Sequence, residues 1–148
     1  MAEFKSKKFL YKNSVKWQSE MKGVLSSFDK PCIEVATPPE FRGHAGIWSP
    51  EDFFVASVNC CIMTTFLYYA KREQIELLSY ESEAKGTLER VESKFMFSEV
   101  EVRPKICIKT KEQVEKIKEI VLLSEKNCLI SSSIASKVTV YPEVSLGL

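Results

Sequence analysis

The chain has 148 residues, of which 45% are apolar and 28% charged, and these values are ordinary for a globular domain with a core. The formal net charge of +1 gives no indication of binding to nucleic acid or to acidic lipid. The N-terminal residues lack the apolar stretch of a signal peptide, and the five cysteines are an odd number, so we expect a cytoplasmic, reducing setting without a disulfide framework.

Three short strands are predicted in the first quarter of the chain. Apolar residues of one parity indicate a first strand with one buried face: Phe9, Tyr11, Val15 and Trp17. Residues 22–23 and 29–31 have the composition of turns, so residues 24–28 and 32–37 are the next two predicted strands. Residues 37–48 carry two prolines and two glycines, which predicts a loop that leads directly into the next element.

Residues 49–72 are predicted to form a long central helix. Ser49 suits the N-cap, Pro50 the first turn, and Glu51 and Asp52 complement the positive end of the helix dipole. Residues 53–70 include no charge and are apolar on every side, which is typical of a helix buried all round or of a membrane span. Polar residues within the run and the lack of a second such segment favour the buried helix.

A long hairpin is predicted after this helix, with arms at residues 77–90 and 93–110. Its second arm changes parity between Phe97 and Val100, which predicts a β-bulge near residues 98–99. Cys107 is expected on the outward face of that arm. Residues 111–126 have the pattern of an amphipathic helix, residues 127–131 end it or begin a short extra helix, and residues 137–142 are the last predicted strand.

This order of elements predicts an α+β fold in which antiparallel sheets wrap around a long buried central helix, as a single domain over residues 1–148. A helix that is apolar on all faces needs more cover than six strands on one side can give. We therefore expect an intertwined homodimer, in which two such helices pack together inside a shared sheet layer.

Two motifs in the chain resemble those of the OsmC/Ohr family. The segment SPEDFFVASVNCC is similar to the family's Asn/Ser-Pro-Glu-Glu helix start with a cysteine twelve positions later, and from Ser49 that cysteine is Cys61. The segment NCLIS is similar to the late Cys-Pro-apolar-Ser motif, with Cys128, Ser131 and Leu129 where proline is usual. The order of elements also matches, so the resemblance covers essentially the whole chain.

The resemblance implies a thiol-dependent peroxidase that reduces organic hydroperoxides in oxidative stress defence. It implies that Cys61 attacks the peroxide, that Cys128 resolves the product, and that Glu51 and an arginine assist. OsmC-like members carry this arginine in the loop before the helix, where Arg42 lies. Ohr-like members carry it in the first strand turn, where this chain has Lys22, so the chain looks more like the OsmC type. A solvated loop charge is the alternative for Arg42.

The chemistry requires a cysteine that is a thiolate at neutral pH, and a nearby cation such as Arg42 lowers a thiol pKa from its free value of about 8.5. Glu51 and Cys61 are ten residues apart, which is about 15 Å on a straight helix, so Glu51 can assist only the Cys61 of the partner subunit. Cys60 points about 100° away from Cys61, as a small buried hydrophobe.

We expect no cofactor and no metal, because a zinc site built from Cys60, Cys61, Cys128 and His44 lacks the usual ligand spacing. The expected partners are a second copy of the chain, a small organic hydroperoxide, and a thiol reductant, either a small dithiol or a protein-bound lipoyl group. Neither nucleic acid nor a membrane is expected. The alternative function is a binding or stress-response module of the same fold without efficient peroxidase activity.

Overall fold

The computed structural model describes residues 6–148, and the chain divides into two compact units, Met1–Asp52 and Phe53–Leu148. The helix α1 begins at the end of the first unit and continues through the second. The single domain over residues 1–148 stays a prediction. The helices and strands are β1 (Ser14–Ser19), β2 (Lys22–Ser26), β3 (Ile33–Ala36), η1 (Pro39–Phe41), α1 (Pro50–Arg72), β4 (Leu77–Val91), β5 (Lys94–Ile108), η2 (Lys111–Gln113), α2 (Val114–Asn127), η3 (Ser131–Ser133), β6 (Lys137–Val140) and β7 (Glu143–Leu146).

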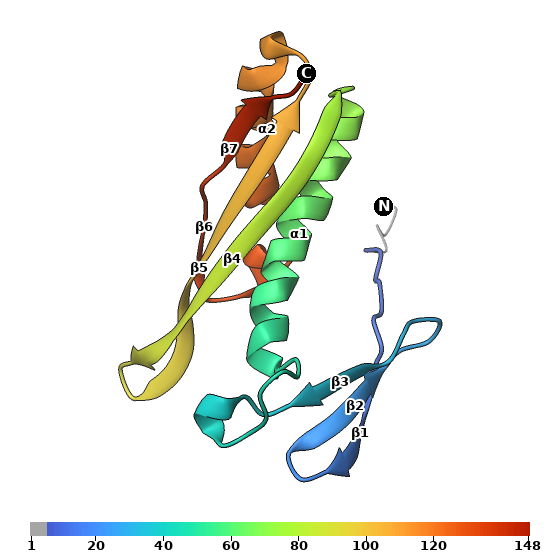
Figure 1. Ribbon diagram of the computed structural model, residues 1–148, viewed down its shortest axis with the longest axis vertical. Coiled ribbons are helices and arrows are strands. Elements are labelled where there is room, and N and C mark those ends of the chain that lie inside the picture. The colour runs from blue at the N-terminus through green and yellow to red at the C-terminus, as the bar shows by residue number, and fades with distance from the viewer. Residues whose placement is uncertain (1–5) are drawn as a thin grey trace, which may run out of the picture. The chain divides into compact units, whose positions relative to one another are not determined.

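The first unit holds an antiparallel sheet in the order β1-β2-β3 (Figure 1). The turn between β1 and β2 was placed wrongly from the sequence, because Gly23 pairs with Trp17 inside the sheet and the chain reverses at Glu20, whose φ is 47°. Gly23 is needed for a different reason. A Cβ on it would lie 2.8 Å from the carbonyl oxygen of Lys16, which is closer than real Cβ atoms approach backbone oxygen.

The first strand differs from its prediction in length and in burial. Phe9 and Tyr11 precede β1 and are not part of the sheet. Val15 and Trp17 do share one face of β1, but that face is not buried in the single chain, since these side chains are 68% and 74% exposed. The alternation therefore marks an apolar face that the chain itself leaves uncovered.

The loop before α1 is irregular as predicted, except for the single turn η1. Arg42 ends that turn with a left-handed φ of 62°. Gly43 then allows the chain to fold back on itself, because a Cβ at this position would overlap the carbonyl oxygen of Thr37. The backbone N–H of His44 donates to the same carbonyl at 2.8 Å.

The start of α1 is a reciprocal capping box. The Ser49 N–H donates to the Asp52 carboxylate at 2.9 Å, and the Asp52 N–H donates to the Ser49 hydroxyl oxygen at 3.1 Å. This confirms Ser49 as the N-cap residue. Because Asp52 makes the capping contacts, the carboxylate of Glu51 is not used for this purpose, and its Oε2 atom is buried without a hydrogen-bond partner among residues 6–148.

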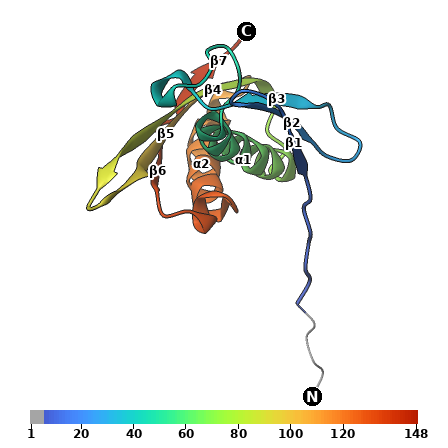
Figure 2. The same cartoon turned by 90° about the horizontal axis from the view of Figure 1, so that it is seen from below.

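The second unit is a sheet covered on one face by α1 and α2, which lie side by side (Figures 1 and 2). Its centre is the long hairpin of β4 and β5, which confirms the predicted antiparallel arms. The pairing is not antiparallel throughout, because β6 and β7 both run parallel to β5 and β7 was not predicted. A parallel neighbour requires a crossover connection, and α2 provides it between β5 and β6.

The predicted bulge is present at Ser98. Glu99 pairs with Thr87 and Phe97 pairs with Leu88, so Ser98 is the extra residue of β5. The bulge changes the parity of the strand, and both Phe97 and Val100 therefore face the helices. The Phe97 ring stacks on Phe54 of α1 with centroids 4.6 Å apart, while Val100 is fully buried.

Two clusters form the core of the second unit, and α1 contributes one stripe of side chains to both. The stripe consists of residues at helical spacing: Val58, Ile62, Phe66 and Ala70. The opposite face of α1 is exposed in the single chain, with Tyr68 at 64%, and its cover by a second copy in the predicted homodimer stays a prediction. By length and composition alone, α1 is also long and apolar enough to cross a membrane.

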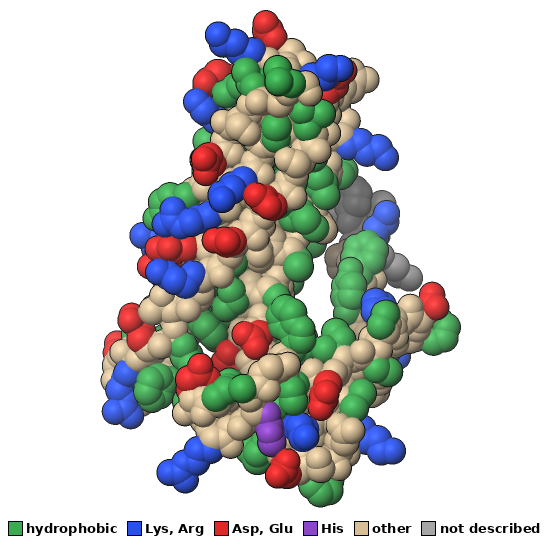
Figure 3. Space-filling model, in the orientation of Figure 1, with side chains coloured by type: hydrophobic (Ala, Val, Ile, Leu, Met, Phe, Trp, Pro, Cys, Tyr) green, Lys and Arg blue, Asp and Glu red, His purple; other side chains and the backbone are tan. Residues whose placement is uncertain are grey.

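The face of the β4–β5 hairpin that is turned away from the helices is charged. Figure 3 shows basic and acidic side chains interspersed over this hairpin. Glu101 lies at the centre of one group, where it forms ion pairs with Lys85 at 3.8 Å and Arg103 at 3.4 Å. Cys107 follows on the same face, as expected, and is partly exposed.

Candidate active site

The middle of α1 carries two adjacent cysteines, Cys60 and Cys61, and they differ in burial. Cys60 is exposed, so it is not the buried hydrophobe that the sequence analysis expected. Cys61 is partly buried and packs against the core cluster that contains Cys128, which is fully buried. The thiols of Cys61 and Cys128 lie close enough for each to shift the pKa of the other. The structure therefore brings together the two cysteines that were predicted to act as a pair.

The segment after α2 places Cys128 at this position. The helix ends because Cys128 has an extended backbone, with φ −67° and ψ 116°. The chain then turns at once into η3, and Cys128 caps this turn with its sulfur, which accepts a hydrogen bond from the Ser131 N–H at 3.4 Å. The Cys128 carbonyl accepts a second bond from the Ser132 N–H at 3.1 Å. This confirms the short extra helix predicted near residues 127–131.

The Thr65 hydroxyl oxygen lies 3.9 Å from the sulfur of Cys61. The Cys128 thiol and the backbone of Ile130 and Leu129 also act on the pKa of Cys61. Partial burial alone would raise the pKa of Cys61, but the hydrogen bonds from these groups outweigh it and hold the pKa below its ordinary value. Cys61 is therefore the more acidic thiol of the pair.

Cys128 shows the opposite behaviour. Its burial raises its pKa, and the neighbouring Cys61 raises it further, against the lowering effect of Ser131. One thiol of the pair thus tends to ionise, while the other tends to stay protonated. Such a difference in acidity is expected when one thiol is the nucleophile and the other is a resolving thiol.

The surroundings of the pair are apolar. Val58 and Ile62 of α1 and Val100 and Val102 of β5 are fully or almost fully buried beside Cys128. Partly buried residues complete this wall: Phe54, Val55, Ala84, Ile130, Ile134, Val138 and Val140. The two sulfurs are therefore enclosed mainly by apolar side chains.

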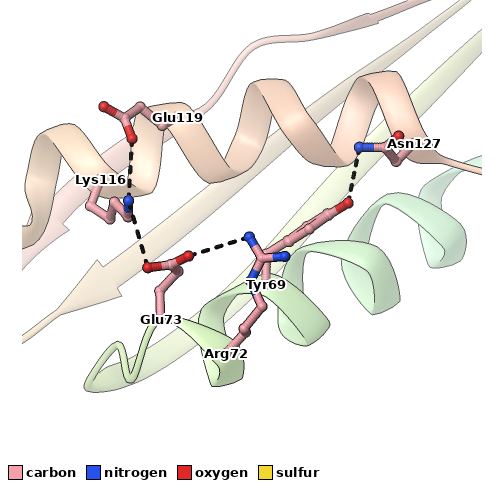
Figure 4. Close-up of polar contacts among 6 residues, drawn as sticks. All are labelled: Tyr69, Arg72, Glu73, Lys116, Glu119 and Asn127. Atoms are coloured by element: carbon pink, nitrogen blue, oxygen red, sulfur yellow. Dashed lines mark hydrogen bonds and ion pairs between the residues drawn. The ribbon is translucent and has the colours of Figure 1, made fainter.

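A polar network holds α2 against the C-terminal part of α1 (Figure 4). Asn127 donates to the Tyr69 hydroxyl at 2.9 Å, and the Arg72 guanidinium lies 4.9 Å from the centre of the Tyr69 ring. Glu73 accepts from Arg72 at 3.3 Å and pairs with Lys116 of α2 at 3.6 Å. Because Asn127 directly precedes Cys128, this network also holds the residue before the second thiol.

The other predicted site residues, Arg42 and Glu51, lie in the first unit. Arg42 is exposed and forms no ion pair with a carboxylate of residues 6–52, where Glu20 instead pairs with Lys22 and His44. Glu51 lies in the first turn of α1. The action of these two residues on Cys61 stays a prediction. Among residues 6–148, no group of three His, Cys, Asp or Glu residues that could hold a metal ion is found.

Sequence reasoning missed several participants. Thr65 follows Cys61 by four residues, a spacing that places both on one helix face and that could have been noticed. Tyr69 lies one further turn along the same helix. The N–H groups of Leu129 and Ile130 carry no side-chain signal, apart from the fact that neither residue is a proline.

These features define a class: an α+β protein with two neighbouring thiols of unequal acidity, one on its central helix and one at the turn after its second helix. The chain belongs to the family described as OsmC-like protein, whose pattern matches residues 43–143. This confirms the resemblance noted from the two sequence motifs. A comparison with curated proteins found no match.

Solved structures share the fold at low identity. An OsmC-like protein of unknown function from Vibrio cholerae is similar with a TM-score of 0.81 and 20% identity, over 90% of this chain and 99% of its own. An organic hydroperoxide resistance protein from Elizabethkingia anophelis gives 0.71 and 22%, over 95% and 100%. An organic hydroperoxide resistance protein OsmC from Legionella pneumophila gives 0.65 and 22%, over 95% and 100%. Proteins with this fold thus include some named for hydroperoxide resistance.

Proposed function

We propose that this protein is a thiol-dependent peroxidase that reduces organic hydroperoxides, with Cys61 as the nucleophile and Cys128 as the resolving thiol. The observation that carries the proposal is the packing of Cys61 against the buried cluster that contains Cys128, where the pKa of Cys61 is lowered and that of Cys128 is raised. Family membership supports the same reading, since structures of this fold include proteins named for organic hydroperoxide resistance.

The reaction follows from the two thiols. The Cys61 thiolate attacks the terminal oxygen of the hydroperoxide, the O–O bond breaks, and the alcohol leaves with a proton. Cys61 is then a sulfenic acid. The Cys128 sulfur attacks the Cys61 sulfur, a disulfide forms, and the sulfenic oxygen leaves as water. An external dithiol supplies the two electrons that return the pair to the reduced state.

The substrate class follows from the walls of the site. The residues beside the pair in the second unit are Val, Ile, Phe and Ala, and an apolar wall favours a substrate that carries an apolar group next to its peroxide. Hydrogen peroxide lacks such a group. An organic hydroperoxide is therefore the better substrate in this proposal.

Dimerisation completes the proposed site. The exposed face of α1 and the exposed side chains of β1 are the surfaces that a second copy covers. The buried Oε2 atom of Glu51, which has no hydrogen-bond partner among residues 6–148, is satisfied in this proposal by a donor near the partner's Cys61. Arg42 is the proposed cation that assists the attack.

The reductant in this proposal is a dithiol, either a small molecule or a lipoyl group on another protein, and the setting is the reducing cytoplasm. A two-electron dithiol suits the task because it releases Cys61 and Cys128 together and leaves as its own cyclic disulfide.

The test is to mix reduced protein with cumene hydroperoxide or with hydrogen peroxide and to measure peroxide loss and peptide masses. We expect faster loss of the organic peroxide and a disulfide between Cys61 and Cys128. The matched control is Cys60→Ser, which keeps the pair intact and should leave the disulfide unchanged. If peroxide is not consumed, or if only Cys60 is modified, the protein is instead a binding or stress-response module of this fold.

A further inference from the structure

Two adjacent threonines of α1, Thr64 and Thr65, contact different atoms of Cys61. The Thr64 hydroxyl donates a 3.2 Å hydrogen bond to the Cys61 carbonyl oxygen. The Thr65 hydroxyl oxygen lies 3.9 Å from the Cys61 sulfur, in a hydrogen bond for which either atom can be the donor. One threonine therefore bonds to the backbone of Cys61 and the other to its thiol.

The helix holds the Thr65 hydroxyl beside the sulfur. Residues four positions apart lie one turn above one another on the same helix face, so Cys61 and Thr65 stay neighbours while α1 is intact. The branch at Cβ restricts the Thr65 side chain to few rotamers. Both residues are partly buried, whereas Thr64 is exposed. The contact is therefore built into the rigid part of the helix.

The hydroxyl of Thr65 has no competing acceptor. A threonine in a helix can donate to the carbonyl three or four positions earlier. Four positions before Thr65 is the Cys61 carbonyl, which already accepts the helix hydrogen bond and the bond from Thr64. Among residues 6–148, the Cys61 sulfur is the only hydrogen-bond partner of the Thr65 hydroxyl.

We propose that the Thr65 hydroxyl is a catalytic hydrogen-bond donor that stabilises the Cys61 sulfur as the attacking thiolate. A neutral thiol can donate to the Thr65 oxygen or accept from it. A thiolate has no proton, so in the charged form only the hydroxyl can donate, and a hydrogen bond to a charged acceptor is stronger than one between neutral groups. The bond therefore favours the thiolate over the thiol.

The surroundings of Cys61 increase the effect of one hydroxyl. Cys128 is the titratable group of the cluster on which Cys61 packs, and the positions that β4, β5 and β6 contribute are apolar: Ala84, Val100, Val102, Val138 and Val140. A hydrogen bond counts for more in such surroundings than in water. Burial raises the pKa of Cys61, and Thr65 is one of the groups that together lower it below its ordinary value. The proposed dimer adds Arg42 and Glu51, which are the same in every variant compared.

The test is Thr65→Val, which replaces the hydroxyl with a methyl group and keeps the branch at Cβ. The readout is the rate of iodoacetamide modification of Cys61 against pH, followed by peptide mass in a Cys32→Ser, Cys60→Ser background that lacks the two exposed thiols. We expect the midpoint to move upward and the rate below the parent's midpoint to fall about three- to tenfold. The plateau at high pH should be no lower, because a less acidic thiol gives a more nucleophilic thiolate.

Two matched variants separate the loss of the donor from a change in packing. Thr64→Val removes the hydroxyl that bonds to the Cys61 carbonyl and should follow the parent profile. Thr65→Ser keeps a hydroxyl beside the sulfur and should stay close to the parent midpoint. An unchanged midpoint in Thr65→Val overturns the proposal. An equal shift in Thr64→Val or in Thr65→Ser also overturns it, because the shift would then not depend on the Thr65 hydroxyl.

A second measurement does not depend on the access of a reagent to the sulfur. The ultraviolet absorbance of the Cys61 thiolate, taken as the difference between each protein and its Cys61→Ser counterpart, should titrate at higher pH in Thr65→Val than in the parent. Coincident titrations overturn the proposal. The inference concerns the nucleophile of the proposed peroxidase and in that sense rests on the proposed function. Neither readout uses peroxide, so a protein that consumes no peroxide would refute the proposed function while these titrations still decide the role of Thr65.

Discussion

The side-chain amide of Asn127 donates a 2.9 Å hydrogen bond to the hydroxyl of Tyr69, and Asn127 is the residue immediately before Cys128. Tyr69 lies eight residues after Cys61 on the same helix, which is about two turns. This bond therefore ties the end of α2 to the helix that carries the other thiol of the pair, and it restrains the approach of the two sulfurs from outside the site.

Removal of the Tyr69 hydroxyl tests this restraint. Tyr69→Phe keeps the ring but leaves Asn127 without its acceptor, so we expect a loss of about 0.5–1.5 kcal/mol in the free energy of unfolding and slower formation of the Cys61–Cys128 disulfide. Urea unfolding of the reduced protein and timed mass analysis measure the two effects. Tyr68→Phe is the control, because Tyr68 is exposed and its hydroxyl makes no hydrogen bond among residues 6–148. Equal behaviour of the two variants would contradict the role of Asn127.

Loss of the neighbouring thiol should make Cys61 less acidic. Cys128 donates to Cys61 and helps to hold its pKa below the ordinary value, so Cys128→Ala should move the pH midpoint of Cys61 alkylation upward. The sign is fixed by the donor: without it the thiolate is less favoured, and the reaction at neutral pH slows. Cys107→Ala, which changes a thiol on the outward face of β5, is the control. A downward shift in Cys128→Ala would show that burial, and not hydrogen bonding, dominates at Cys61.

Gly86 of β4 sets the distance between the sheet and α1. A Cβ at this position would overlap the Val55 side chain and approach the Phe97 ring to 3.0 Å. We expect Gly86→Ala to cost about 1–3 kcal/mol of stability, as overpacked cores do. The double variant Gly86→Ala, Val55→Ala should recover part of this loss relative to the sum of the single changes, because it removes the overlapping methyl groups. Strict additivity in a thermal or urea unfolding cycle would argue against the contact.

The proposed exchange of Glu51 between subunits can be tested by mixing two inactive variants. Glu51→Gln supplies an intact Cys61, and Cys61→Ser supplies an intact Glu51. If the two residues act across a dimer, equimolar mixing with subunit exchange should restore about a quarter of the parent activity, because half of the dimers then contain one complete site. A mixture that stays inactive, although exchange is confirmed by mass, would place Glu51 and Cys61 in the same functional subunit or remove Glu51 from the reaction.

Much of the second unit could be predicted from local sequence patterns. The Ser49 cap, the two arms of the hairpin and the bulge at Ser98 all follow from residues that are close together in the chain. The parallel pairing of β6 and β7 with β5 could not be predicted in this way. The paired residues are more than thirty positions apart in the chain, and the sequence of a short strand does not indicate whether it pairs in parallel or antiparallel. The turn at Glu20 was missed since Gly23, two residues into the next strand, has the stronger turn composition.

The candidate site was predictable in its side chains and not in its backbone. The spacing of Cys61 and Cys128 within two motifs pointed to the pair that the structure brings into contact. The turn that begins at residue 129, whose Ser131 N–H donates to the Cys128 sulfur, depends on the extended conformation of Cys128, which no propensity scale specifies. Leu129 stands where the family motif has proline, so this chain has a backbone N–H at a position where proline has none.

The complete burial of Cys128 has a consequence for the recovery of the oxidised protein. A disulfide between the two cysteines would expose only its Cys61 side, because the Cys128 sulfur is enclosed by the core while Cys61 is partly accessible. An incoming thiolate can then attack only the Cys61 sulfur, which forms a mixed disulfide there and releases Cys128 as the leaving group. The raised pKa of Cys128 makes it a slow leaving group. Turnover would then be limited by regeneration, and monothiols such as glutathione would be poorer reductants than dithiols, whose second sulfur displaces Cys61 from the mixed disulfide before the reaction can reverse.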